Sequence, residues 1–440
     1  MLWPWPLSTR HKRLFRLTSA RWQRRAIFLL GGIGVGAAAV ALAQLADLAQ
    51  YAFALLLAKS RYAVLAVTPL GFMLSAYMTL RLFPNAQGSG IPQAVAARQL
   101  TDQAARESLV SIRIAIGKMI LTLFGLLCGG SVGREGPTVQ VGASIMFALG
   151  RVSPRRQPGL ILAGAAAGVA AAFNTPLAGI VFGIEEMSRA FETRTSSLII
   201  AAVIAAGLTS LALAGNYAYF GSSAMTLSRG ADWLAVPACG VVGGLVGGLF
   251  SRVVIAMARG FKSPLGRAIK GHPLWFAFAC GLAVAICGLV SGDTIYGTGY
   301  VQVKEALDHG TPLPQDFGVL KLLATSFAAI SGIPGGIFSP SLAVGAGIGS
   351  NIAAFFHDAP LGAIMLLGMV SYFAGVVQAP ITAFVIVTEM TDNHGMVVPL
   401  MAAALIAHFV SRMICEEGIY HALAKGFVER ATRPREGEGR

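Results

Sequence analysis

The chain has 440 residues, of which 55% are hydrophobic and only 12% are charged, and its formal net charge is +14. Soluble domains carry roughly a quarter charged residues, so this composition excludes a soluble globular protein. The mean hydropathy of +0.67 and the apolar segments that recur along the chain predict a polytopic membrane protein instead. About ten or more helical crossings can be accommodated, at about 20 apolar residues each.

The N-terminal segment, residues 1–25, is strongly basic. It holds seven Arg or Lys residues, and the first acidic residue of the chain is Asp47. Cytoplasmic flanks of membrane helices are enriched in Lys and Arg, so we expect a cytoplasmic N-terminus. The tryptophans among these charges suit a membrane interface, and no nucleic-acid partner is expected. The apolar run from Ala26 to Ala58 is too long for a cleavable signal peptide and is interpreted as the first membrane helix.

Later apolar segments are interrupted by Gly and Pro, and several are too short for a full crossing, which predicts broken helices. Irregular backbone at membrane depth is tolerated only where protein buries it or where it lines a wet cavity. Such interruptions at corresponding places of two halves point to a transport site. The polar stretch 216–233 divides the membrane domain, 26–425, into halves of about 26–220 and 230–425. The apolar segments lie at 26–58, 63–83, 110–130, 137–150, 159–187, 197–215, 234–258, 274–291, 318–331, 340–357, 360–390 and 396–412.

The C-terminal residues 426–440 form a polar tail. Only 28 residues follow Arg412, too few for a sizeable cytoplasmic domain. We expect the tail to be disordered, and its basic residues favour a cytoplasmic location.

The first candidate for function is Gly88-Ser-Gly-Ile-Pro92. Its glycines allow close backbone approach, its proline suits the first turn of a helix, and the Ser89 hydroxyl can donate a hydrogen bond to an anion. A simple turn before a helix would have the same pattern, so this motif alone does not decide between the two interpretations.

The second candidate, Gly133-Arg-Glu-Gly-Pro137, opens the apolar segment Thr138–Leu149. A helix N-terminus has unpaired N–H groups and a partial positive charge, so it binds anions readily. Arg134 and Gly136 belong to such a terminus, and Glu135 can occupy the anion site with its own carboxylate. Protonation or displacement would then open the site, which makes Glu135 a gate and a proton carrier. The alternative is an interfacial Arg/Glu pair on a loop, but ionisable groups at membrane depth are functional by default.

The third candidate, Gly335–Pro340, places two glycines before a helix start predicted at Pro340. The backbone N–H groups of Ile337 and Phe338 would point into the cavity without adding a full charge, and anion binding by dipoles alone is weak enough to permit rapid exit.

Further ionisable residues lie in apolar surroundings. Glu185 and Glu186 are adjacent, and neighbouring residues face different sides of a helix, so one can be structural while the other lines a proton route. Lys118 and Glu389 are expected to pair with neighbouring groups and to fix packing.

An enzyme is poorly supported. No P-loop or HExxH motif is present, and Ser131, the serine of the one GxSxG pattern, follows an apolar membrane helix rather than a strand. The five cysteines and the scattered histidines lack ligand spacing. We therefore expect no disulfide framework, no metal site and no cofactor.

Taken together, the three motifs in order within a polytopic chain resemble the CLC family of chloride channels and H+/Cl− exchange transporters, over residues 60–425 approximately. The resemblance implies an all-α fold of two inverted-topology halves built from tilted and broken helices, with one pore per subunit of a homodimer. It also implies a multi-pass protein of the bacterial inner membrane. The cytoplasmic CBS pair of many eukaryotic members has no counterpart here, so nucleotide regulation by that route is not expected.

The resemblance also implies roles for individual residues. Ser89, the amides of Ile337 and Phe338, and Tyr420 would bind the central anion. Glu135 would be the gating glutamate. The internal proton glutamate would be Glu186, with Glu185 as its packing neighbour. The serine at position 89 is typical of members that use chloride.

The function expected from these assignments is H+/Cl− antiport with a glutamate gate, with chloride and protons as the transported species. A passive chloride channel, or transport of nitrate or another anion, on the same scaffold is the alternative. A membrane-embedded enzyme is a remote third possibility, because it needs a nucleophile with its base, or a metal cluster, at bilayer depth.

Overall fold

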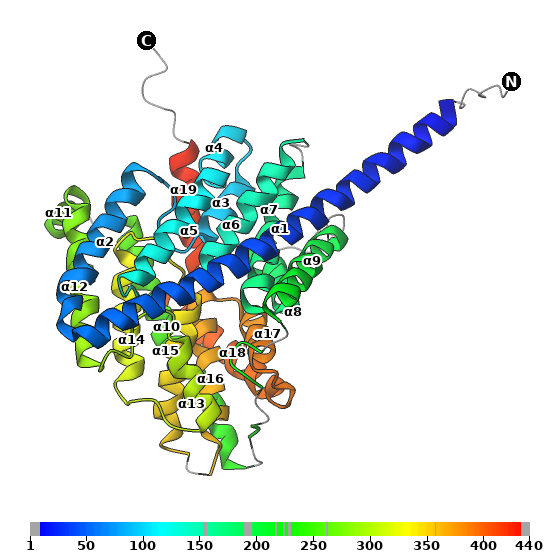
Figure 1. The fold of residues 1–440 in the computed structure, drawn as a ribbon. Helices are drawn as coiled ribbons and strands as arrows, with labels where there is room; N and C mark the ends of the chain where they lie inside the picture. The colour runs from blue at the N-terminus through cyan, green and yellow to red at the C-terminus, as the bar shows by residue number, and fades with distance from the viewer. Residues whose placement is uncertain are drawn as a thin grey trace.

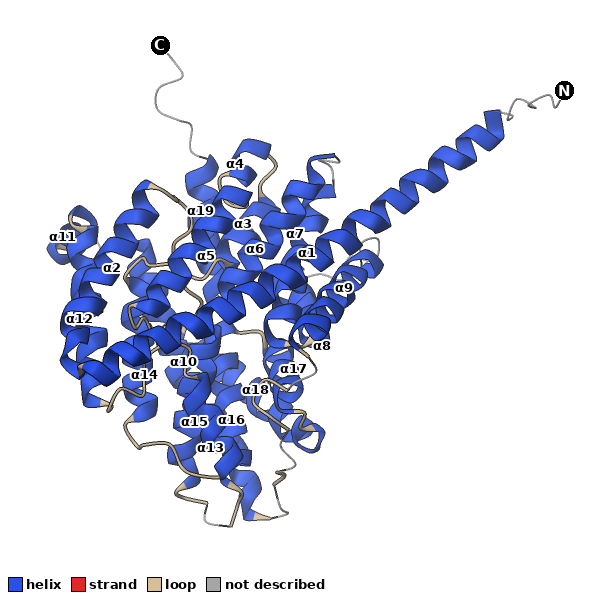
Figure 2. Cartoon of the chain, viewed as in Figure 1, coloured by secondary structure: helices blue, strands red, loops and turns tan. Residues whose placement is uncertain are grey.

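The computed structural model describes residues 9–152, 156–188, 196–215, 218–222, 225–227, 230–260, 263–356 and 358–432. Within these ranges the backbone is helical almost throughout, and extended pairing is limited to two isolated bridges (Figures 1 and 2). Helices satisfy their backbone N–H and C=O groups internally, as a bilayer requires. The all-α membrane fold expected from the sequence is confirmed.

The chain forms two successive sets of helices. Between α9 and the short turn that precedes α10, the described residues form no helix. The first set is α1 (Thr9–Lys59), α2 (Val64–Arg81), α3 (Ile91–Gln99), α4 (Gln103–Glu107), α5 (Ile112–Leu127), α6 (Glu135–Leu149), α7 (Gln157–Phe173), α8 (Pro176–Phe182), which continues as the π-helical turn η4 (Gly183–Ser188), and α9 (Ser196–Ala214). The second set is α10 (Ala235–Arg259), α11 (Pro264–Gly271), α12 (Pro273–Val290), α13 (Tyr300–His309), α14 (Phe317–Ile330), α15 (Phe338–Ala353), α16 (Leu361–Val377), α17 (Pro380–Thr391), α18 (Val397–Ile414) and α19 (Ile419–Thr432).

The membrane domain contains both long and short apolar helices. Seven helical stretches of the described residues are long and apolar enough to cross a bilayer, whereas α7, α14, α16 and α17 are apolar helices of 10–17 residues. The predicted segments 159–187 and 360–390 are each divided in two, after Asn174 and Gln378, which both adopt a left-handed conformation. A proline then starts the next helix in each case, because its missing N–H is not needed in the first turn.

The first helix, α1, is 51 residues long, or about 75 Å at 1.5 Å per residue. Its apolar part, Arg25–Lys59, has 35 residues, more than the roughly 20 that a perpendicular crossing needs, so it is long enough to lie tilted. Figure 1 shows α1 running obliquely across the other helices. Residues from Thr9 onward thus belong to the same helix as the membrane segment, and residues 1–8 of the predicted basic segment lie outside the described residues.

At the other end of the chain, α19 continues to Thr432. Residues 426–432, assigned to the polar tail from the sequence, are therefore helical, and 433–440 lie outside the described residues. The start of α1, the end of α19, and helices α4 and α11 lie toward the same end of the molecule (Figure 1).

Two pairs of matching contacts relate the halves. Glu389 of α17 accepts hydrogen bonds from the backbone N–H groups of Leu177 and Ala178 at 3.1 and 2.7 Å, at the start of α8. Glu185, which follows α8, accepts from Ile381 and Thr382 at 3.1 and 2.6 Å, at the start of α17. Such reciprocity arises about a two-fold axis, here the axis between inverted repeats.

Two buried lysines form the second pair. Lys118 of α5 donates to the carbonyl oxygens of Ala86, at 2.8 Å, and Gly88, just before α3. Lys321 of α14 donates to those of Ile295 and Gly297, both at 2.8 Å, just before α13. Each ammonium group thus fixes the loop before a short helix of its own half, α3 for Lys118 and α13 for Lys321. The predicted packing roles of Lys118 and Glu389 are thus confirmed, and the halves have the inverted-repeat arrangement.

We predict that Glu389→Ala destabilises the protein without abolishing transport. The substitution leaves two N–H groups at the start of α8 without their acceptor, and loss of a helix cap costs about 0.5–2 kcal/mol. The thermal midpoint in detergent should fall, whereas Glu305→Ala, on an exposed part of α13, should leave it unchanged. Equal midpoints for the two variants would contradict the capping role.

Candidate functional site

The three sequence motifs meet at one place near the middle of the fold. Gly88 exchanges backbone hydrogen bonds with the 333–335 segment, through Gly88 N to Ile333 O at 3.1 Å and Gly335 N to Gly88 O at 3.0 Å. Gly133 and Gly336 exchange a second pair, at 2.6 and 2.7 Å. These bridges bring segments from both halves together and fix three loops relative to one another.

Three helices begin at these loops: α3 at Ile91, α6 at Glu135 and α15 at Phe338. The backbone N–H groups of Ile337 and Phe338 donate to no acceptor within the described part of the chain. Unpaired N–H groups at a helix start carry partial positive charge and favour an anion. The structure therefore gathers positive helix ends at the site without a full positive charge.

Two buried hydroxyl groups face the same region. Ser89 is 7% exposed and lies just before α3, and Tyr420 is fully buried near the start of α19, which packs against α3. Neither has a hydrogen-bond partner among the described side chains and backbone. Leaving a buried donor unpaired costs about 1–3 kcal/mol, and a monatomic anion can accept from both hydroxyls at once. Ser89 and Tyr420 thus lie together, as the resemblance implies.

The start of α6 approaches the Ser89 loop so closely that position 136 admits no side chain. A Cβ on Gly136 would contact the Ser89 Oγ, lie 2.7 Å from the Ser89 carbonyl oxygen and lie 3.2 Å from the Gly336 Cα. Glycine at 136 is therefore needed for the two loops to meet around a small ligand.

We predict that Gly136→Ala lowers chloride transport about ten- to hundredfold, because overpacking of this kind costs about 1–3 kcal/mol. Chloride efflux from liposomes measures this loss. Gly426→Ala is the control, since a Cβ on that residue of α19 meets nothing within 4 Å. Transport at the unmodified rate in Gly136→Ala would contradict the close approach.

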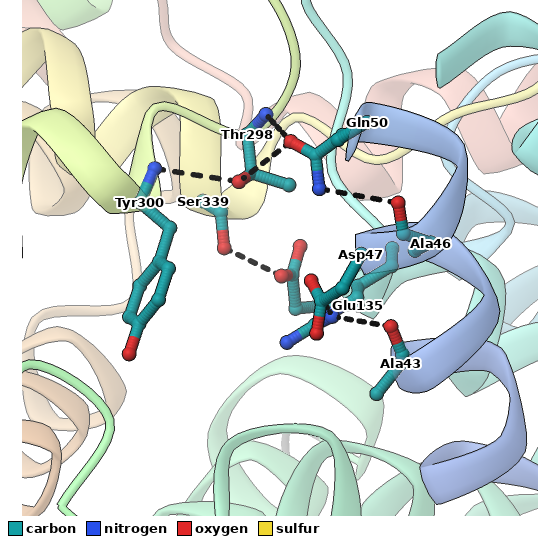
Figure 3. A network of polar contacts seen from close by, with 9 residues as sticks. Ala43, Ala46, Asp47, Gln50, Glu135, Thr298, Tyr300 and Ser339 are labelled. Atoms are coloured by element: carbon teal, nitrogen blue, oxygen red, sulfur yellow. Dashed lines mark hydrogen bonds and ion pairs between the residues drawn. The ribbon is translucent and has the colours of Figure 1, made fainter. Parts of the chain in front are cut away.

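Glu135 is the first residue of α6 and is 1% exposed. Its Oε1 accepts a hydrogen bond from the Ser339 hydroxyl at 2.5 Å (Figure 3). The carboxylate also interacts with the backbone N–H groups of Glu135 and Ser339. It therefore occupies the positive start of α15 with its own negative charge, which is where an incoming anion would bind.

Arg134 does not share the position of Glu135. Its guanidinium donates to the Ala43 carbonyl and to Asp47 of α1, both at 2.7 Å, so the predicted ionisable pair is divided between two environments. Arg134 contributes backbone, not a side-chain charge, to the α6 start. It also lines a cavity of about 230 Å³, together with Asp47, Tyr219 and Tyr300.

The two adjacent glutamates have different surroundings. Glu185 is engaged at the start of α17, so its predicted packing role is confirmed. Glu186 is 3% exposed, and the Nε2 atom of His421, the neighbour of Tyr420 on α19, lies 3.5 Å from its Oε1. The start of α19 therefore lies beside the buried carboxylate.

Ser131 lies beside the site but not in a catalytic arrangement. It is fully buried, and its hydroxyl is 3.0 Å from the hydroxyl of Thr325 on α14. A hydroxyl does not act as the general base of a serine nucleophile. In the described ranges, no group of three or more His, Cys, Asp or Glu side chains has a geometry for metal binding.

Sequence reasoning missed Ser339, Lys321 and Tyr219. Ser339 lies inside the third motif, where its spacing from Glu135 could not be judged. Lys321 is a lone charge in an apolar helix, and comparison with Lys118 in the other half would have indicated its role in fixing a loop. Tyr219 lies between the halves and makes an edge-to-face contact with Tyr300, with ring centroids 4.6 Å apart, a contact without a local signal.

Comparisons with known proteins agree with this geometry. The model of the family described as voltage gated chloride channel matches residues 71–412. The H(+)/Cl(−) exchange transporter ClcA of Yersinia pseudotuberculosis serotype IB (strain PB1/+) is 31% identical over 439 residues, and the match covers 91% of this chain and 88% of the relative.

Two solved structures have the same fold. A slow cyanobacterial Cl−/H+ antiporter has a TM-score of 0.77 and 24% identity, covering 93% of this chain and 99% of that one. A CLC-type fluoride/proton antiporter has a TM-score of 0.77 and 23% identity, covering 93% and 98%. With the family model and the exchanger match, these comparisons show that the chain belongs to the voltage-gated chloride channel family, the CLC family.

Proposed function

We propose that this protein exchanges chloride for protons across a membrane. The observation that carries the proposal is the position of Glu135, whose carboxylate binds Ser339 at the start of α15. When ionised, this carboxylate competes with chloride for the same helix ends, and when protonated it has no charge to hold it there. Anion movement and proton movement are then coupled through one side chain.

The anion site of this proposal consists of Ser89, Tyr420 and the N–H groups of Ile337 and Phe338, with Gly136 at the close contact. Two unpaired buried hydroxyls and two unpaired N–H groups suit a monatomic anion, which needs donors from several directions but no acceptor. Ser89 favours chloride over other anions by the family resemblance. The exchange activity in the printed names of the relative ClcA and of the cyanobacterial antiporter supports the same reaction.

The proton route of the proposal leads from Glu186 to Glu135. Both carboxylates are almost fully buried, and Glu186 follows α8 beside the start of α19, which carries Tyr420 of the proposed anion site. A proton delivered to Glu186 from one side of the membrane would reach Glu135 within the protein and leave on the other side.

The proposed orientation places both termini in the cytoplasm of a bacterial cell, with the protein in the inner membrane as a homodimer. Helices α4, α11 and α19 lie at one end of the molecule (Figure 1) and carry Arg106, Arg267, Lys270, Lys425 and Arg430. An excess of Lys and Arg marks the cytoplasmic side, which supports this direction. The homodimer rests on the family resemblance.

Accumulation of chloride driven by a proton gradient tests the proposal. Liposomes that contain the purified protein have the same chloride concentration inside and outside and a pH difference across the membrane. Valinomycin with K+ holds the voltage at zero. We expect chloride to move uphill with the protons moving the opposite way. Chloride that equilibrates without accumulating would make the protein a passive channel.

A further inference from the structure

His421 lies next to Tyr420 on α19 and contacts the buried glutamate. Its Nε2 is 2.8 Å from the backbone carbonyl oxygen of Glu186 and 3.5 Å from the carboxylate Oε1 of the same residue. The His421 side chain is 13% exposed and that of Glu186 is 5% exposed. The imidazole is thus the more solvent-accessible member of the pair.

The contact also indicates which ring nitrogen carries a proton. A carbonyl oxygen only accepts hydrogen bonds, so Nε2 of His421 is the donor toward Glu186. The neutral imidazole in this geometry therefore carries its proton on Nε2, and Nδ1 is its basic nitrogen. A proton taken up at Nδ1 gives an imidazolium whose Nε2 atom lies 3.5 Å from the Glu186 Oε1.

Other charges surround this pair on the elements that pack against α19. The turn η4 contributes Glu185, which is engaged by the start of α17. Helix α3 contributes Arg98, which donates to the carbonyl of Met187 at 2.7 Å. Helix α16 has no charged side chain. Helix α10 contributes Arg252 and Arg259, and α19 with the residues before it contributes Glu416, Glu417, Lys425, Glu429 and Arg430. Arg259 and Lys425 are paired to Glu417.

We propose that His421 relays protons between the solution on the α19 side and Glu186. The imidazolium gives its Nε2 proton to the Glu186 carboxylate, so an N–H bond breaks, an O–H bond forms, and neutral imidazole and a carboxylic acid result. The transfer leaves the ring with its proton on Nδ1 and with Nε2 bare. Exchange with water, in which Nδ1 releases its proton and Nε2 takes one up, restores the Nε2–H form, and Nδ1 can then accept the next proton from the solution. This relay rests on the proposed exchange of chloride for protons, for which it supplies the entry step.

The relay is tested by His421→Gln and His421→Ala in liposomes, measured as chloride-driven proton uptake at starting pH values from 5.5 to 8.5. Glutamine keeps a donor for the Glu186 carbonyl but cannot relay a proton at these pH values. We expect proton uptake to fall about tenfold in both variants, less than the roughly 10²- to 10⁴-fold typical for loss of a proton-transferring group, because water replaces the ring. The pH dependence of proton uptake should also change in both variants, because the relaying ring is absent.

Two controls separate a relay from a packing role. Each His421 variant is combined with Glu135→Gln. The chloride flux of these double variants should equal that of Glu135→Gln alone, and this result would show that the anion path is intact. His394→Gln should have no effect, since His394 is 80% exposed beside Asp392. If His421→Ala is impaired but His421→Gln is normal, the hydrogen bond to the carbonyl is structural and the relay is overturned.

The remaining outcomes are also decisive. Unchanged proton uptake and an unchanged pH profile in both variants would overturn the relay but leave the exchange intact. If His421→Ala does not fold, His421→Gln decides, because normal proton uptake in that variant overturns the relay. Absence of any chloride-driven proton uptake in the unmodified protein would overturn the exchange itself.

Discussion

Replacing Glu135 with Gln is expected to abolish proton movement while chloride still passes. The glutamine amide does not bind and release a proton as a carboxyl group does, so it cannot carry one. It also has no negative charge with which to compete with chloride for the start of α15. Its carbonyl oxygen can still accept the hydrogen bond from Ser339, so the local structure is kept. Chloride efflux and proton uptake in the same liposomes measure the two effects separately.

The matched control for this variant is Glu305→Gln, which removes an exposed carboxylate on α13 and should preserve coupling. In Glu135→Gln we expect proton uptake at the level of empty liposomes. Proton movement driven by chloride in that variant would contradict the assignment of Glu135 as gate and carrier.

The pH dependence of chloride flux follows from the same carboxylate. Ionised Glu135 occupies the anion position, so flux should be low at high pH and rise as the pH falls and the carboxyl group becomes protonated. In Glu135→Gln this dependence should be lost, because no group at the start of α15 titrates. Both profiles come from the liposome assay used for the coupling measurement.

The second large effect is expected for Glu186→Gln. Proton uptake should fall at least about tenfold, because the proton-transfer contribution of a positioned carboxyl group is typically this large or larger. Chloride passage should continue, since Glu186 does not belong to the proposed anion site and Glu135 can still exchange protons with the opposite side. A variant with normal chloride-to-proton coupling would show that Glu186 is a packing residue.

The neighbouring carboxylate gives a sharp comparison. Glu185→Gln removes the charge that accepts from Ile381 and Thr382, so it should lower the thermal midpoint while coupling persists. We thus expect Glu185→Gln to lower stability and Glu186→Gln to lower proton transport. Loss of coupling in Glu185→Gln at an unchanged midpoint would reverse the two roles.

Local sequence patterns predicted the parts of the site that depend on local structure. Glycines and prolines in the three motifs mark loops before helices, and all three loops are found at one place. The start of α15 was placed too late, at Pro340, because proline was taken as the first helical residue. The apolar segment after the second motif was taken to begin at Thr138, also too late for α6. Proline is tolerated throughout the first turn, and the helices begin at Glu135 and Phe338.

Features that depend on pairing between the halves could not be predicted. Glu185 and Glu389 cap helices about 200 residues away in the chain, and no local spacing signals such a contact. Arg134 is adjacent to Glu135 in sequence, yet its guanidinium binds α1, because the helix start turns the two side chains apart. The contact of His421 with Glu186 likewise depends on α19 packing against the site, which no local sequence pattern indicates.

The measurement that tests the account most directly is proton uptake into liposomes driven by an imposed chloride gradient, with the voltage held by valinomycin and K+. The account predicts that protons move against their own gradient, and that Glu135→Gln and Glu186→Gln remove this movement. Chloride flux in the unmodified protein without any proton movement would contradict it and leave a passive anion pathway.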